Sequence, residues 1–250
     1  TATKVAGLLP YSAFRNTTWR MLRTSLDSFD AFVACSGFLR RRFELLHPSA
    51  GEVYAIHNPV IVGDETSVPE NRILYVGRLS IEKGTMVLLK AFSSLLEVRP
   101  ESRLTIVGTG PLEGRLRRGV SDSAQLKNSV TIAGYVPPPE VSRFFERSSI
   151  VVVPSVWPEP FGRTPAEAMA AARPVIASSS GGIPEVVEHG KTGLLVSPGK
   201  PEALSVALGE LLPDRRKIVK MGHRGHERAA RTFSRRVIAS KFAGLYEKIT

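Results

Sequence analysis

The sequence has one cysteine, few aromatic residues and no long apolar run. With Cys35 alone the chain cannot form an internal disulfide, which predicts a reducing, cytoplasmic setting. No run reaches the ~18–20 apolar residues that a membrane-spanning helix needs, so no transmembrane segment is expected. The histidines are scattered and lack thiol or carboxylate partners at ligand spacing, so we expect no metal site and no metal cofactor.

Basic residues outnumber acidic ones by a net charge of +11, and the excess lies at the two ends of the chain. Residues 1–48 carry seven basic and three acidic residues, and residues 214–250 carry eleven and three. These ends lack the interleaved aromatic residues and zinc spacing of nucleic-acid-binding proteins, so nucleic acid is not an expected partner. They fit either solvated helix faces rich in arginine or a surface for an anionic membrane or a partner chain.

From residue 72 onward, short apolar runs rich in β-branched residues alternate with helical patterns. The expected strands are Arg72–Gly77, Ser102–Gly108, Ser129–Gly134, Ser149–Pro154, Pro174–Ser178 and Gly193–Val196. Strands of this kind between amphipathic helices predict a parallel sheet covered on both faces, which is a doubly wound α/β fold. Ligands of such folds bind beyond the carboxyl ends of the strands.

The two ends of the chain differ from this pattern. Near the N-terminus, strands at 31–36 and 52–57 flank a helix at 37–46, which is too little for a doubly wound sheet of its own. After residue 200 we expect only helices, at 201–212, 214–232 and 234–249, and the last of them has a predicted apolar stripe of Val237, Phe242, Leu245 and Tyr246. The predicted fold is therefore a Rossmann-like doubly wound parallel sheet followed by C-terminal helices.

The most informative motif is the stretch 153–185, which leaves a strand, crosses a proline-rich loop and enters a helix. Gly162 permits close approach of a ligand to the backbone. Thr164 is the expected N-cap, with Pro165 at the first helical position. The helix start is then an anion site, and Glu159 and Glu167 can accept hydrogen bonds from vicinal hydroxyls of a sugar or a ribose.

Both carboxylates also have simpler explanations. Thr164 and Glu167 have the spacing of a capping box, in which Glu167 only satisfies the amide of the N-cap residue. Glu159 taken alone fits a solvated loop residue. Only the whole arrangement favours a ligand site.

A second motif lies at 77–84, where the first strand of the sheet ends and the next helix begins. Arg78 can bind phosphate in a fork, and Lys83 adds a compact positive charge. Gly77 and Gly84 let the loop fold tightly. Arginine and lysine near a helix start are also common as plain surface residues.

Together these motifs resemble family 4 of the retaining GT-B glycosyltransferases. The matching segments are Gly77-Arg78 with Lys83, Val107–Pro111, Gly134-Tyr135-Val136, Pro154-Ser155, the pair Glu159 and Glu167, and Gly181–Glu185. Their order and spacing match across residues 53–250, and the combination is specific although each piece is weak.

The resemblance implies a role for each matched residue. Arg78 and Lys83 would hold the diphosphate of a nucleoside-diphosphate sugar, without a metal. Glu159 would contact the transferred sugar and Glu167 the ribose. The other donor-binding residues would be Gly77, Tyr135 and Val136, the latter two beside the base, and the backbone amides of Phe161, Gly162, Arg163 and Thr164.

The resemblance also implies a domain plan. Residues 1–60 would be the tail of an acceptor domain plus linker, residues 61–232 the nucleotide-sugar-binding domain, and residues 233–250 a helix that packs back on the N-terminal part. The chain departs from the family at Asn58-Pro59, where Asn-Gly is usual, and in the small size of its acceptor part. A second chain that supplies an acceptor domain, or an anionic membrane at the inner face, is therefore an expected partner.

The implied function is transfer of a sugar from a nucleoside diphosphate to an acceptor with retention of configuration. Two alternatives remain open: a module that binds nucleotide sugar without turnover, and a basic scaffold that binds a partner chain or membrane. The base, the sugar, the acceptor and the linkage are not specified by these motifs.

Overall fold

The computed structural model describes residues 26, 29–48 and 51–249. Its largest element is a six-stranded sheet in which every pairing is parallel, in the order β5-β4-β3-β6-β7-β8. The strands are β3 (Arg72–Val76), β4 (Arg103–Val107), β5 (Val130–Gly134), β6 (Ile150–Val153), β7 (Val175–Ser178) and β8 (Gly193–Val196). This order confirms the predicted doubly wound parallel sheet.

The helices that cover this sheet follow the predicted alternation, with two short additions. They are α3 (Thr85–Val98), α4 (Glu113–Ser121), α5 (Ala124–Ser129), α6 (Pro138–Glu146), α7 (Arg163–Ala170), α8 (Ile183–Val186) and α9 (Pro201–Leu211). The short helices α5 and α8 were not predicted, because four to six residues contain too little periodicity to identify a helix.

Alternate residues of each strand enter two different hydrophobic cores, as the two-residue period of a strand requires. Ile73, Ile106 and Ile150 pack with α3 and α9 on one face. Leu74 and Val151 pack with α6, α7 and α8 on the other. Burial of both faces explains why these strands read as almost continuous apolar runs.

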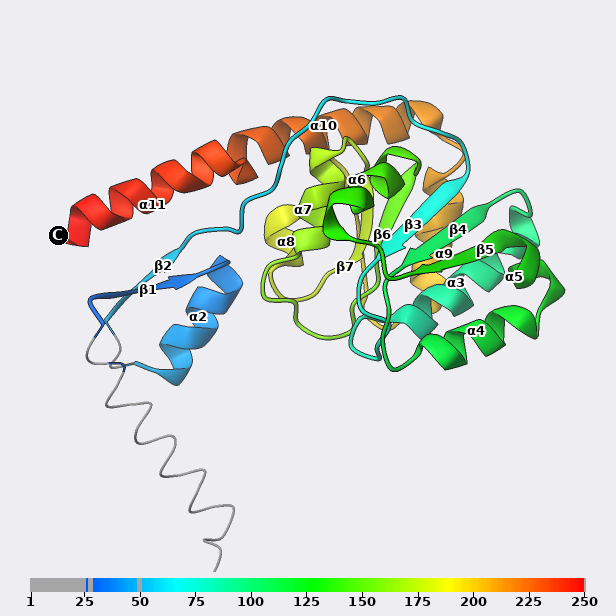
Figure 1. The fold of residues 1–250 in the computed structure, drawn as a ribbon, viewed down its shortest axis with the longest axis horizontal. Helices are drawn as coiled ribbons and strands as arrows, with labels where there is room; N and C mark the ends of the chain where they lie inside the picture. Colours follow the sequence, from blue (N-terminus) through cyan, green and yellow to red (C-terminus); the bar gives the residue numbers. More distant parts are fainter. Residues whose placement is uncertain (1–25, 27–28, 49–50, 250) are drawn as a thin grey trace, which may run out of the picture.

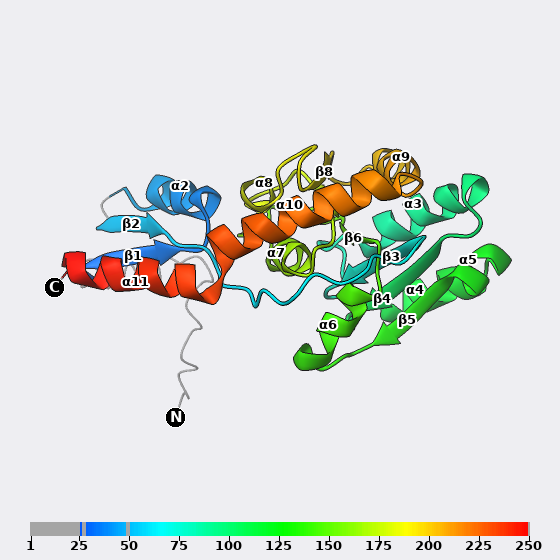
Figure 2. The same ribbon diagram turned by 90° about the horizontal axis from the view of Figure 1, so that it is seen from above.

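A smaller unit lies beside this domain. β1 (Ala31–Ala34) and β2 (Glu52–Ala55) form a parallel pair, and α2 (Gly37–Leu46) connects them. α2 packs on one side of the pair and α11 (Arg235–Ile249) on the other (Figure 2). The residues of α11 in this contact are Ile238, Phe242 and Leu245, whereas Tyr246 of the predicted apolar stripe is 60% exposed. The basic residues at positions 4, 15, 20 and 23 lie outside the described residues.

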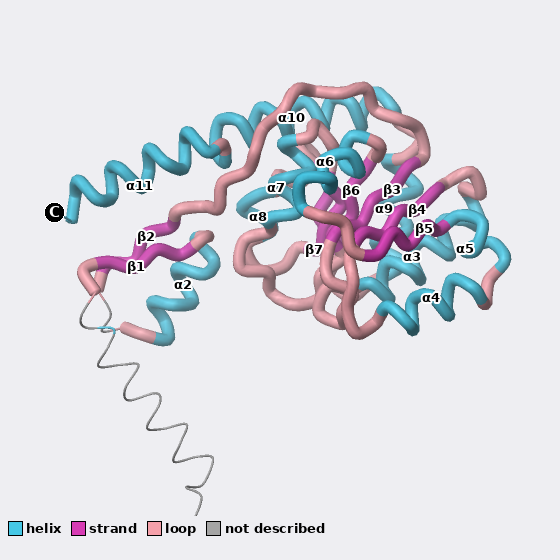
Figure 3. The backbone as a smooth tube through the Cα atoms, in the orientation of Figure 1, coloured by secondary structure: helices cyan, strands magenta, loops and turns pink. Residues whose placement is uncertain are grey.

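The longest helix, α10 (Arg215–Phe233), joins the two parts of the molecule (Figure 1). It packs on α7, and the helix is interrupted at Ser234, where α11 begins. The loop of residues 56–71 runs beside α10 from β2 to β3 (Figure 3), and the amide of Val60 donates to the carbonyl of Phe233 at 2.9 Å. Within the described residues, every helix is too short or too polar to cross a membrane.

Arg173 fastens the same loop to the sheet domain. Its side chain is fully buried between α7 and β7. The guanidinium donates to the carbonyls of Phe145, Glu146, Thr66 and Ser67 at 3.0–3.2 Å. Because these partners come from α6 and from the loop before β3, one side chain holds three segments together.

We expect Arg173→Met to lower the free energy of unfolding by about 3 kcal/mol or more, because several buried carbonyls would lose their donor. Arg103→Met is the matched control, since Arg103 is exposed and also donates to two carbonyls. We expect Arg103→Met to change the free energy of unfolding by no more than about 0.5 kcal/mol. Urea unfolding followed by circular dichroism measures both, and equal losses would contradict the role given to Arg173.

Candidate functional site

The order of the strands determines where a ligand can bind. β3 and β6 are neighbours at the centre of the sheet, and from them the chain proceeds in opposite directions, to β4 on one side and β7 on the other. The crevice beyond the carboxyl ends of two such strands is the usual binding place of doubly wound folds. It is bordered here by the β3 loop (77–84) and the β6 loop (154–162).

Close backbone contacts hold these two loops together. The amide of Val156 donates to the carbonyl of Glu82 at 2.9 Å. Gly84 has a φ of +70°, and a Cβ added there would lie 1.9 Å from the carbonyl oxygen of Pro154. Only glycine allows both this conformation and this approach. The contact places Lys83 directly beside the β6 loop.

Lys83 and Glu159 form an ion pair between the two loops. Lys83 Nζ lies 2.6 Å from Glu159 Oε1, and the Ser155 hydroxyl donates to the same oxygen at 2.5 Å. The Glu159 side chain is only 10% exposed, so it is not the solvated loop residue that one interpretation suggested. Oε2 accepts no hydrogen bond from the described residues, which leaves it available to a hydroxyl donor.

An open pocket of about 530 Å³ lies beyond the carboxyl ends of β3, β4 and β5, and neither Lys83 nor Glu159 is among its lining residues. It brings together four of the predicted residues, since its lining includes Gly77, Arg78, Tyr135 and Val136. Arg78 and Tyr135 are exposed, and the Arg78 guanidinium makes no hydrogen bond or ion pair within the described part of the chain.

The side chain of Tyr75 is hydrogen-bonded to the backbone of Arg78. Its hydroxyl donates to the Arg78 carbonyl at 2.8 Å. Burial raises the pKa of this hydroxyl well above its usual range. Sequence analysis gave Tyr75 no role, because its position inside an apolar strand is typical of a core residue.

The start of α7 differs from the prediction. The N-cap is Gly162, with a φ of +102°, and Thr164 is already the second residue of the helix. The Thr164 hydroxyl donates to the Val76 carbonyl at 3.4 Å, and Glu167 accepts from Arg163 Nε at 2.7 Å. The predicted Thr164 N-cap and the capping-box interpretation of Glu167 are therefore wrong, because the left-handed glycine starts the helix two residues earlier.

The remaining predicted residues lie on the same loop. Phe161 is buried and its ring packs between His57 and Phe233, so that only its backbone can meet a ligand. The first amides of α7 at Arg163 and Thr164 lack partners inside the helix, and the positive end of the helix dipole lies there. Residues 161–164 do not line the pocket of Arg78, although Thr164 bonds to Val76 at its edge.

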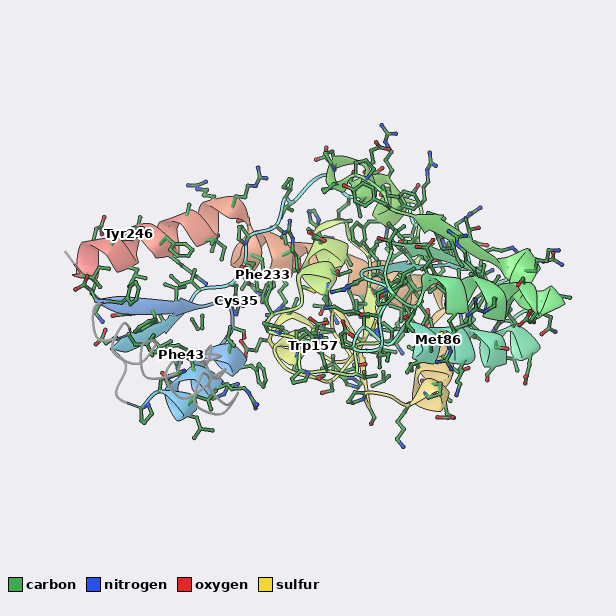
Figure 4. All side chains as sticks on the ribbon, turned by 60° about the horizontal axis from the view of Figure 1, so that its bottom comes forward. Cys35, Phe43, Met86, Trp157, Phe233 and Tyr246 are labelled. Atoms are coloured by element: carbon green, nitrogen blue, oxygen red, sulfur yellow. The ribbon has the colours of Figure 1, made fainter. Side chains whose placement is uncertain are left out.

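Two residues near the ion pair were missed by sequence reasoning. Ser155 belonged to a matching segment but received no role, and its contact to Glu159 follows from its place just after β6. Trp157 is 40% exposed, and its ring centroid lies 5.3 Å from Lys83 Nζ. Figure 4 shows Trp157 on the β6 loop. An isolated tryptophan in a proline-rich loop has no spacing that would identify it as a site residue.

The described residues contain no group of three or more histidine, cysteine, aspartate or glutamate side chains arranged to hold a metal ion. The charged side chains of the two loops and of the start of α7 are Arg78, Glu82, Lys83, Glu159, Arg163 and Glu167.

Comparison with known proteins gives relatives in several bacteria. The chain is 35% identical over 179 residues to a D-inositol 3-phosphate glycosyltransferase of Corynebacterium glutamicum, covering 70% of this chain and 42% of that protein. It is 31% identical over 182 residues to spore coat protein SA of Bacillus subtilis, covering 70% and 48%. The chain therefore spans less than half the length of these curated relatives.

Solved structures share the fold. The Anabaena Alr3699/HepE protein in complex with UDP superposes with a TM-score of 0.81 at 23% identity, over 96% of this chain and 70% of that chain. Sucrose-phosphate synthase of Thermosynechococcus elongatus gives 0.79 at 27% identity, over 97% and 64%. The family model of glycosyl transferases group 1 matches residues 62–228. Because this match spans the whole sheet and both loops of the site, the chain belongs to the group 1 glycosyl transferase family.

Proposed function

We propose that this chain binds a nucleoside-diphosphate sugar and transfers its sugar to an acceptor with retention of configuration. The observation that carries the proposal is the ion pair of Lys83 and Glu159 at the centre of the sheet edge, on the same β3 loop whose Arg78 lines the open pocket. Residues 61–232 would hold the donor. The glycosyltransferase relative and the UDP complex of the structural neighbour support this choice of ligand.

The proposed donor site divides into three parts. The base would lie in the open pocket against Tyr135 and Val136, and the ribose hydroxyls would meet Glu167. The diphosphate would lie at the β3 loop, between Arg78, Lys83 and the first amides of α7. Fixed cations and helix dipoles in these positions stabilise the negative charge that develops on a departing nucleoside diphosphate.

The sugar would occupy the space next to Glu159, with a hydroxyl donating to Oε2. In the transfer step the bond between the anomeric carbon and the phosphate oxygen breaks, and the acceptor oxygen bonds to the same face of that carbon. The acceptor proton passes to the departing phosphate oxygen. Because Arg78 and Lys83 neutralise the leaving group, we propose that no metal ion is needed.

Removal of either cation should weaken donor binding. We expect Arg78→Ala and Lys83→Ala each to reduce affinity for UDP-glucose about 10- to 150-fold, because each removes a charge-assisted contact of about 1.5–3 kcal/mol. Titration calorimetry with UDP-, GDP- and ADP-glucose identifies the donor and then measures the loss.

Lys90→Ala is the control, since Lys90 is exposed on α3, within two helical turns of Lys83. It removes the same charge and should leave affinity unchanged. Wild-type affinity in both test variants would contradict the proposed site. Product analysis of the incubated donor distinguishes a transferase from a module that binds without turnover.

Glu167→Gln tests the ribose contact. Its partner Arg163 is 74% exposed, and such helical pairs contribute about 0.3–0.5 kcal/mol, so the melting temperature should hardly change. Donor affinity should fall several-fold, because the amide accepts hydrogen bonds less strongly than the carboxylate. Glu44→Gln, which breaks a similar exposed pair with Arg40 on α2, should change neither property.

We also propose that α10 faces an anionic membrane. Its exposed side chains include five cations, Arg216, Lys217, Lys220, Arg224 and Arg231. On a helix these positions lie within about 100° of one another, so they form one stripe, in which Glu227 is the acidic exception. A row of cations attracts anionic lipid at about 1 kcal/mol per residue near the surface.

The triple variant Arg216→Gln, Lys220→Gln, Arg224→Gln should bind vesicles of anionic phosphatidylglycerol about 100-fold more weakly, since three such contacts are lost. The variant Arg115→Gln, Arg118→Gln, Lys127→Gln removes the same charge from exposed positions of α4 and α5 and should bind as the wild type does. Sedimentation with vesicles at low and high salt measures both. Equal loss in the two variants would indicate an effect of net charge alone.

A further inference from the structure

The small unit touches the β6 loop just after Glu159. The Ser36 hydroxyl, at the N-cap of α2, donates to the carbonyl of Pro160. The ring of His57 stacks on Phe161 with 5.4 Å between centroids. Two consecutive residues of the β6 loop are thus held from outside the sheet domain.

A third contact is made by Glu185 on α8. Its carboxylate accepts from the amide of Gly37 at 2.7 Å and from that of Phe38 at 2.5 Å. Arg41 and His57 lie 3.5 and 3.6 Å from the same group. The first amides of a helix have no internal partners, and the first turn of α2 contains no acidic residue of its own. Glu185 therefore supplies the negative charge that the start of α2 lacks.

Glu185 is connected to Glu159 by a short and tightly packed path. The amide of Gly182 donates to the Glu159 carbonyl at 2.7 Å, and the Ser180 hydroxyl donates to the Trp157 carbonyl at 2.9 Å. A Cβ added at Gly181 would lie 2.2 Å from the Glu159 carbonyl oxygen. The segment 180–182 thus lies directly against the backbone of the β6 loop, and α8 follows it without a gap.

We propose that Glu185 is a positioning residue of the donor site. Its carboxylate clamps the start of α2 to α8, and the clamp holds the segment against which the Glu159 backbone rests. Glu185 acts through Glu159 and does not contact the donor. The link to sugar binding rests on the proposed function, whereas the clamp itself is a property of the fold.

Three variants isolate the clamp. Glu185→Ala removes it, and Glu185→Gln keeps the shape and one acceptor oxygen, which provides a second variant should the first fail to fold. Glu188→Ala is the control, because Glu188 lies three positions further on and binds Arg228 and Lys191 instead of α2. All are made with Trp19→Phe, so that Trp157 is the only remaining tryptophan.

The first measurement, fluorescence quenching of Trp157, is made without a nucleotide sugar. Trp157 lies on the β6 loop, and its carbonyl is bonded to the segment that the clamp holds. Loosening of that segment should increase quenching of Trp157 fluorescence by acrylamide in Glu185→Ala, less so in Glu185→Gln, and not in Glu188→Ala. Unchanged quenching in both Glu185 variants overturns the clamp.

The second measurement compares affinity for the free nucleoside diphosphate with that for its glucose conjugate, using whichever of UDP, GDP and ADP binds the wild type. The affinity for the glucose conjugate divided by the affinity for the free nucleoside diphosphate reports how much the sugar contributes to binding. We expect Glu185→Ala to reduce this ratio about 2- to 30-fold, the range for residues that influence a site from a distance, with little change for the nucleotide alone.

A double-mutant cycle with Glu159→Ala separates positioning from general loosening. If Glu185 acts through Glu159, the double variant shows no further loss of the sugar contribution beyond that of Glu159→Ala. Additive losses, or an unchanged ratio in both Glu185 variants, overturn the positioning role. A wild type that binds none of the nucleotides contradicts the proposed function instead, and the quenching result still decides whether the clamp exists.

Discussion

A buried carboxylate needs a partner, and this requirement organises the site. Glu159 is almost removed from water, which costs free energy unless charge and hydrogen bonds compensate it. Lys83 and Ser155 supply that compensation at one oxygen, and Lys83 is 76 positions away in the sequence. The pair can form only because β3 and β6 are neighbours where the winding of the sheet reverses. Such a pair contributes little net stability, and in the proposed function its role is to present a fixed cation and a fixed carboxylate to the donor.

The remainder of the molecule holds the two loops in place. Two cores, one on each face of the sheet, fix the strands from which the loops depart. α10 packs on α7 and ends at Phe233, which belongs to the hydrophobic cluster against which Cys35 of the small unit packs (Figure 4). Arg173 fastens the loop between the two parts, and Glu185 fastens α2. The β6 loop is therefore contacted on one side by the β3 loop and on the other by the small unit.

Sequence reasoning predicted which residues gather at this edge of the sheet better than it predicted their local backbone geometry. The motifs placed Arg78 and Tyr135 directly after the first and third strands of the sheet, and both line one pocket. The same reasoning assigned Thr164 as the N-cap of α7, where Gly162 in the left-handed region starts the helix instead. Capping preferences are averages over many helices, and a glycine with positive φ is decided by the packing around it. Tyr246 likewise fitted the apolar periodicity of α11, yet it is exposed, whereas Ile238 and Leu245 are buried.

The sequence by itself determined the period of each element, the parallel sheet that follows from buried β-branched strands, and the loops on which a ligand would be bound. Those properties are local, since they depend on residues within one strand, helix or turn. Only the tertiary structure decided which side chains meet: Lys83 with Glu159, Tyr75 with the Arg78 carbonyl, and Glu185 with the first amides of α2. These partners are set by strand order and by the packing of distant segments, and no local pattern of residues contains that information.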